Sequence, residues 1–245
     1  MTIFVCEDDL ISVLKGAFYI HETGVAPDAV RIAQKDPQQG LFENIVDLRQ
    51  ISVNVYNVLK IIQKTFSPRQ ISRIQGAFLR GDRQVFAEIM QFVALGLKNP
   101  QALQNLTIDC VRIVRESADR VYGEVHRMKG FVRFARLADN RFYAAIKPVH
   151  NVLPLIKNHF VARFGETDWV IYDKGRGLGL FCTAGKAVLC QMAVSNDLFF
   201  DRNEAFYAGL WRTFFEKVAI KERENPRLQR QKVPLFYRDV MTEFM

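Results

Sequence analysis

EVHRMKGFVRFAR, residues 124–136, contains the change of hydrophobic period that decides the fold of the C-terminal half. Before it, apolar residues recur every three or four positions from Cys110 to Met128, as along one side of an amphipathic helix. After Gly130, the period becomes two, which is typical of a strand. The sequence therefore predicts a helix from about residue 108 to 128, followed by a strand at 131–136.

More strands are expected beyond this stretch. An Asp139-Asn140 turn leads to an apolar run at 142–146, so residues 131–146 predict a hairpin. After a helix at 152–164, three short runs at 169–172, 178–182 and 187–192 predict a three-stranded antiparallel meander. A further helix carrying Trp211 is expected to be mostly core and to begin with a capping box of Asp201 and Glu204.

The N-terminal side predicts a small strand-helix-strand unit and a helical middle section. Strands are expected at residues 2–6, 29–33 and 44–48, and helices from Asp8 or Asp9, over 51–66 and twice between 67 and 98. The expected fold class is α+β, with a mainly antiparallel sheet of hairpin and meander packed by several amphipathic helices. One large domain, 1–245, is predicted, with a division into 1–105 and 106–245 as the alternative.

Positive charge is concentrated after residue 50. The 245-residue chain has a net charge of +8, but its first 50 residues hold four Lys/Arg against eight Asp/Glu, which leaves 30 against 18, or +12, for the rest. A basic surface favours binding to phosphate backbones, although many basic proteins bind no polyanion. Charge alone leaves both interpretations open.

The sequence contains no membrane-spanning or metal-binding signal. The N-terminal residues include the acidic cluster Glu7, Asp8 and Asp9, and no apolar run approaches the roughly 18 residues of a membrane span, which predicts a cytoplasmic protein with no membrane partner. The four cysteines show no CxxC spacing, and the four histidines show no ligand pattern. No metal and no cofactor are expected.

Cations and aromatic rings alternate in the stretch 124–136. In a strand, Phe131 and Arg133 would share one side, where arginine pairs with phosphates and rings stack on bases. The alternative is that Phe131 lies in the core and the arginines keep a sheet edge soluble. The candidate nucleic-acid-binding residues here are His126, Arg127, Lys129, Phe131 and Arg133.

The glycine-rich segment DKGRGLG at 173–179 offers a second candidate. Its spacing matches neither GxxxxGK[ST] nor GxGxxG, so a tight turn between strands is favoured over a nucleotide site. Lys174 and Arg176 are still candidates for meeting a phosphate from that turn. His126 or His150 as general base and Asp173 as carboxylate are candidates for catalysis, with a structural role favoured for each.

Residues 221–232, KERENPRLQRQK, form the third candidate. Because Pro226 disfavours helical geometry at Asn225, a basic loop is expected over 225–232. Such a loop would present cations to a phosphate backbone or an acidic partner, and a solvated helix end is an equally good interpretation. The candidate residues are Arg223, Asn225, Arg227, Gln229, Arg230 and Lys232.

Five motifs of the C-terminal half resemble, in the same order, those of a bacterial family of DNA metabolism proteins: EVHRMKGFVRF (124–134), AIKPVHNVLP (145–154), HFVARF (159–164), WVIYDKGRGLGLF (169–181) and LWRTFFEKVAIKERENPRLQRQKVPLFY (210–237). The resemblance implies association with a radical SAM DNA repair or modification protein and, in some members, fusion to a uracil-DNA-glycosylase-like domain. No catalytic residue carries over. This sequence also lacks the CxxxCxxC of a radical SAM cluster and a GQDPY-like glycosylase segment.

The leading hypothesis is therefore an accessory protein that binds or positions nucleic acid, with DNA favoured, for a radical SAM or glycosylase-type partner. One alternative is a protein-only adaptor, since aromatic residues and arginine are also favoured at protein interfaces. Another is a hydrolase or glycosylase that acts on DNA through His126, His150 or Asp173.

Overall fold

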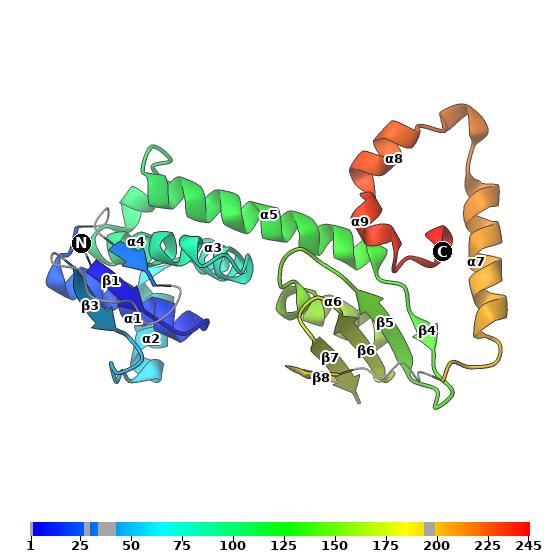
Figure 1. The fold of residues 1–245 in the computed structure, drawn as a ribbon, viewed down its shortest axis with the longest axis horizontal. Helices are drawn as coiled ribbons and strands as arrows, with labels where there is room; N and C mark the ends of the chain where they lie inside the picture. Colours follow the sequence, from blue (N-terminus) through cyan, green and yellow to red (C-terminus); the bar gives the residue numbers. More distant parts are fainter. Residues whose placement is uncertain (1, 27–29, 34–42, 194–198) are drawn as a thin grey trace. The chain divides into compact units, whose positions relative to one another are not determined.

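The computed structural model describes residues 2–26, 30–33, 43–193 and 199–245. The chain divides into two compact units, residues 1–123 and 124–245 (Figure 1). Helix α5, Asp109–Phe131, begins in the first unit and ends in the second. Each unit is described by itself below.

The first unit contains a three-stranded parallel sheet. Strand β1 (Thr2–Val5) lies between β2 (Val30–Ile32) and β3 (Asn44–Asp47), with Thr2 paired to Val30 on one side and to Asn44 on the other. Helix α1 (Leu10–Thr23) connects β1 and β2, and the Asp9 side chain accepts a hydrogen bond from the Ser12 amide at its first turn. The predicted strand-helix-strand unit is confirmed, except that Ala29 lies outside the described residues.

Helices make up the rest of this unit. Helices α2 (Val55–Thr65), α3 (Pro68–Leu79) and α4 (Gln84–Lys98) are followed by the short helix η2 (Pro100–Gln104) and by the first part of α5. Helix α3 begins with a reciprocal capping box of Ser67 and Gln70. Helix α4 packs against α1, where Gly16 leaves room for the Met90 side chain.

A five-stranded mixed sheet forms the centre of the second unit. The order is β4 (Ala135–Arg136), β5 (Phe142–Ile146), β6 (Trp169–Asp173), β7 (Leu178–Thr183) and β8 (Lys186–Gln191). The predicted hairpin (β4–β5) and meander (β6–β8) are both present and antiparallel. Helix α6 (Leu153–Phe164) crosses over between them, so β5 and β6 pair in parallel and join the two parts into one sheet.

The two faces of this sheet differ. On one face, the fully buried Trp169 contacts Phe160 and Phe164 of α6, with ring centroids 6.2 and 6.4 Å away. Because side chains alternate along a strand, Tyr143, Ala145, Val170 and Tyr172 point to the other face. Tyr143 and Val170 form a small buried cluster there.

The described residues after β8 include three α-helices and two short 3-10 helices. These are α7 (Glu204–Val218), η3 (Lys221–Arg223), α8 (Pro226–Lys232), α9 (Leu235–Arg238) and η4 (Thr242–Phe244). Figure 1 shows α7, α8, α9 and the C-terminus along an arc beside β4 and the end of α5.

The predicted strand at 131–136 is mostly wrong. Helix α5 continues through Phe131, and only Ala135 and Arg136 form a strand. The helix extends because the Phe131 ring packs against Tyr237, with centroids 5.6 Å apart, and Arg133 Nη1 donates to the Gly130 carbonyl 2.6 Å away. Phe131 and Arg133 therefore do not share one side of a strand.

Two other local predictions are corrected. Helix α7 was expected to be mostly core, but none of its residues, all of which are described, is buried. Its expected capping box is absent: the Asp201 carboxylate accepts from the Asn203 amide, while the Glu204 carboxylate accepts from the Arg136 amide. The expected loop at 225–232 is helix α8, because Pro226 takes the first helical position and the Asn225 side chain caps the Leu228 amide.

No helix within the described parts of the chain is long and apolar enough to span a bilayer.

Replacing Gly96 of α4 by alanine should destabilise the protein by about 1–3 kcal/mol, because the new Cβ would lie 2.4 Å from a ring carbon of Phe66 and 2.8 Å from Leu103. The measurement is denaturant unfolding followed by far-UV circular dichroism. The same change at Gly209 of α7, where a Cβ meets no atom within 4 Å, should instead stabilise by up to about 1 kcal/mol. If both substitutions changed the free energy of unfolding equally, the close packing around Gly96 would be contradicted.

Candidate functional site

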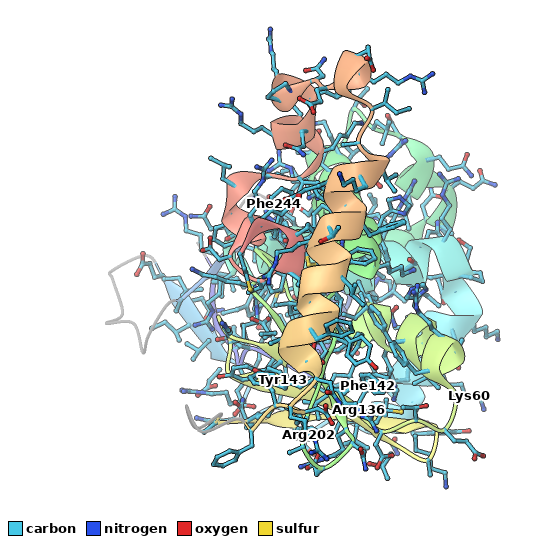
Figure 2. All side chains as sticks on the ribbon, turned by 90° about the vertical axis from the view of Figure 1, so that its right-hand side faces the viewer. Lys60, Arg136, Phe142, Tyr143, Arg202 and Phe244 are labelled. Carbon is cyan, nitrogen blue, oxygen red and sulfur yellow. The ribbon has the colours of Figure 1, made fainter. Side chains whose placement is uncertain are left out.

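The open face of the five-stranded sheet is the floor of a hollow of about 870 Å³, called here the sheet groove. Tyr143, Ala145, Tyr172 and Lys174 line its floor, and α7 and the C-terminal segment form its walls. Figure 2 labels Tyr143 and Arg202 near the beginning of α7, and Phe244 beside its later turns. The complete lining is Arg133, Ala135, Tyr143, Ala145, Tyr172, Lys174, Phe200, Asp201, Arg202, Glu204, Ala205, Ala208, Arg212, Val240, Thr242 and Met245.

Small residues keep the groove open on the helix side. Ala205, Ala208 and Arg212 follow each other at three- and four-residue intervals, so they share one side of α7, and all three line the groove. Ala145 lies on the floor. The methyl groups of Ala145, Ala205 and Ala208 leave space that larger side chains would fill.

The lining of the sheet groove carries more cations than acids. Within the described part of the chain, the side chains of Lys174, Arg202 and Arg212 take part in no hydrogen bond, ion pair or ring contact. The carboxylates of Asp201 and Glu204 accept backbone amides at 2.8 Å each. An amide hydrogen bond does not remove the charge of a carboxylate, so the four cations and two acids of the lining leave a net charge of +2 for a ligand.

Two tyrosines add polar groups to an apolar floor. Burial raises the pKa of Tyr143, and the neighbouring Tyr172 raises it further. Among the described residues, neither hydroxyl has a hydrogen-bond partner. An apolar floor with a few convergent polar groups is typical of ligand sites.

Arg133 has a different role from the other cations of the groove. Its guanidinium binds both oxygens of Glu243, and it lies over the Trp211 ring, 5.3 Å from the centroid. Trp211 Nε1 donates to Glu243 as well, over 3.1 Å. Burial alone would raise the pKa of Glu243, but these hydrogen bonds outweigh burial and hold it below the usual value. Arg133 thus fixes the C-terminal segment against α7.

Glu124 is a fully buried carboxylate that sequence reasoning missed. It accepts hydrogen bonds from the Val149 and His150 amides at 2.7 and 2.8 Å, and from the Tyr237 hydroxyl and His150 Nδ1 at 2.6 Å each. Burial alone would raise its pKa, yet these donors outweigh burial and lower it. Burial and the bond to Glu124 raise the pKa of Tyr237 to about 12.

A second buried carboxylate, Asp173, holds the same loop from the other side. It accepts from the Gly175 and Arg176 amides at 2.9 and 3.2 Å and from Arg176 Nη1 at 3.0 Å. The Arg176 guanidinium also donates to the carbonyls of Pro148 and Val149. Residues 148–150 are thus held between Asp173–Arg176 and Glu124. The turn predicted within 173–179 is confirmed, because residues 174–177 connect the antiparallel strands β6 and β7.

A second hollow, of about 860 Å³, lies between α7 and α8 and is called here the helix hollow. Its lining is mainly apolar, with Trp211, Phe214, Val218 and Leu228 among the contributors. Four of the predicted residues also line it: Arg223, Asn225, Gln229 and Lys232.

The predicted site residues do not meet in one cleft. Arg133 and Lys174 line the sheet groove, and Arg223, Asn225 and Gln229 line the helix hollow. His150, Asp173 and Arg176 belong to the carboxylate clamps, and Phe131 and Arg127 lie beside Tyr237. Lys232 lines the helix hollow as well. The remaining candidates lie on the surfaces of α5 and α8, where His126, Arg227 and Arg230 are exposed and Lys129 is half-buried.

Several groove residues were missed: Tyr143, Tyr172, Phe200, Arg202 and Arg212. One signal was available, since the three- and four-residue spacing of Ala205, Ala208 and Arg212 marks a helix side with small residues and one cation. No local pattern, however, indicates that this side of α7 faces the sheet. In the described parts of the chain, no group of three or more His, Cys, Asp or Glu residues is placed to bind a metal ion.

The fold and the groove belong to a domain that spans most of the chain. The family model of DUF4130, a domain of unknown function, matches residues 83–243, and the chain belongs to this family. The match covers every motif between residues 124 and 237 and every residue that lines the two hollows except Met245. No curated protein and no solved structure matches the chain.

Changing Glu124 to Gln should destabilise the second unit by about 2–3 kcal/mol at neutral pH, because buried donors lose a charged acceptor. The pKa of the Glu124 carboxyl is lower in the folded than in the unfolded protein. Its contribution to the free energy of unfolding is therefore fully present above the unfolded pKa of about 4.5, and it is lost as the pH falls through the folded pKa. Wild-type stability should therefore fall more steeply below pH 4.5 than that of the variant.

Urea unfolding followed by tryptophan fluorescence measures this effect, because both tryptophans of the chain, Trp169 and Trp211, lie in the second unit. Glu166→Gln, on the surface of the same unit, is the control and should leave stability unchanged. A Glu124→Gln variant as stable as the wild type would contradict the role given to this carboxylate.

Proposed function

We propose that this chain is an accessory protein of DNA metabolism that binds or positions nucleic acid. The observation that carries the proposal is the sheet groove, in which three cations without a partner among the described residues, Lys174, Arg202 and Arg212, lie around an aromatic floor. Cations bind phosphates and aromatic rings bind bases, and both are needed in a nucleic-acid site of this kind. The excess of basic over acidic residues after residue 50 supports attraction to a polyanion.

The motif resemblance described above extends the proposal to a partner. It implies that this chain acts beside a radical SAM DNA repair or modification protein, or beside a uracil-DNA-glycosylase-like domain. The chain lacks the signature motifs of both enzymes, which suits an accessory that presents DNA to one of them.

The test is fluorescence anisotropy with labelled single-stranded and duplex DNA over a salt series. We expect binding that weakens with salt, because each neutralised phosphate contributes a slope of about −0.7 for single strands or −0.9 for duplex in log K against log salt. Lys174→Ala and Arg212→Ala should each weaken binding and make the slope shallower by about that amount. Arg163→Ala, an exposed cation of α6 outside the groove, is the matched control.

Absence of binding even at low salt would overturn the proposal. Binding with a slope that neither groove variant changes would show that nucleic acid is held elsewhere.

An exposed apolar row on α7, which continues into the helix hollow at Phe214 and Val218, supports a second function, the docking of a partner protein. Phe206, Leu210, Phe214 and Val218 are spaced by four residues and form one apolar row, with exposed fractions of 65%, 51%, 57% and 59%. Exposed apolar rows of this kind mark protein interaction sites. In this function the chain would be an adaptor that binds the radical SAM protein.

Co-purification with a co-expressed radical SAM partner tests the adaptor function. The complex should survive nuclease treatment and high salt, and the double change Leu210→Glu and Phe214→Glu should abolish it because charge would be buried in an apolar contact. Val188→Glu on the exposed side of β8 is the control and should leave the complex intact. Retention of the partner by the double variant would reject α7 as the docking surface.

A further inference from the structure

The shape of the sheet groove restricts the form of nucleic acid that can enter it. Its volume of about 870 Å³ is in the range of about 300–1,000 Å³ that is usual for small-molecule sites. The floor lies between α7 and the segment that contains Val240 and Thr242. A base within a duplex is stacked on both sides and paired at its edge, so only an unpaired base can reach such a floor.

The floor also carries groups that suit a single base. Tyr172 and Phe200 present partly exposed rings for stacking, and Ala145 and Ala208 leave space between floor and helix. The hydroxyls of Tyr143 and Tyr172, unpartnered among the described residues, can donate to or accept from the edge of a base. A paired base has no free Watson–Crick edge to offer them.

The three cations that have no partner within the described part of the chain line the groove from different elements. Lys174 follows β6, Arg202 precedes α7, and Arg212 lies two turns into α7. From Glu204 to Arg212 the helix advances eight residues, or about 12 Å, so more than one phosphate can be contacted along the wall.

From these features we infer that the sheet groove binds unpaired nucleotides, either in single-stranded DNA or in a locally opened duplex. The base occupies the space between Tyr172 and the alanine side of α7, and the flanking phosphates bind Lys174, Arg202 and Arg212. The inference rests on the proposed function, because it specifies which form of nucleic acid the groove accepts.

The test compares three labelled ligands of equal length by anisotropy: a single strand, a blunt duplex, and the same duplex with a central unpaired bubble. Stacking of one or more bases should make the single strand and the bubble bind at least about tenfold more tightly than the blunt duplex. Ala208→Trp, which fills the hollow, should abolish this preference. Ala162→Trp on the exposed surface of α6 is the matched control and should preserve it.

A second variant guards against misfolding of Ala208→Trp. Tyr172→Leu keeps an apolar side chain but removes the ring and the hydroxyl, and it should reduce the preference by about tenfold while tryptophan fluorescence and circular dichroism stay native. Equal affinity for blunt and bubble duplexes, or a preference that survives in folded groove variants, would overturn the inference and leave nucleic-acid binding intact. Failure to bind any of the three ligands at low salt would overturn both.

Discussion

The buried carboxylate of Glu124 is the contact on which the rest of the second unit depends. It joins three parts of the chain that are distant in sequence: the end of α5, the loop after β5 and the C-terminal segment with Tyr237. An ionised carboxylate without partners would be costly in the interior, but this one accepts hydrogen bonds from four donors. The loop that Glu124 binds also accepts hydrogen bonds from Arg176, which is paired with Asp173 after β6, so the ends of β5 and β6 are connected through this loop.

Polar anchors of this kind explain how α7 can wall a groove without packing on the sheet. Its first turn is attached to β4 because the Glu204 carboxylate accepts a hydrogen bond from the Arg136 amide. Its middle is attached to the C-terminal segment because Trp211 and Arg133 both donate hydrogen bonds to Glu243. A helix docked through an apolar side would have filled the space in front of Tyr143 and Tyr172. Anchoring through a few directed bonds leaves that space open and leaves apolar rings of α7 exposed on its other sides.

The class of fold and most elements could be predicted from the sequence because they follow from local periodicity. Short apolar runs bounded by turn residues predicted the strands of the meander at 169–192 and those of the N-terminal sheet. The structure has strands in both places. The errors fall where long-range contacts outweigh local pattern. Phe131 stays helical because of Tyr237, more than a hundred residues later, and the apolar residues of α7 read as core although they are exposed.

The site was less predictable for the same reason. Lys174 and Arg133 were found because cations beside glycines and rings are visible in the sequence, but their partners Tyr143, Tyr172 and Arg212 come from separate elements. The buried Glu124 has no sequence signal, since an acid on a helix usually faces solvent.

The anchors of the C-terminal segment also determine the order in which the second unit can be assembled. Tyr237 and Glu124 are 113 residues apart, and Arg133 and Glu243 are 110 apart, so both bonds close loops of more than a hundred residues. Loop closure on this scale is entropically costly and follows the formation of local structure. The wall of the groove depends on both contacts, so the groove is complete only once both of these long loops are closed.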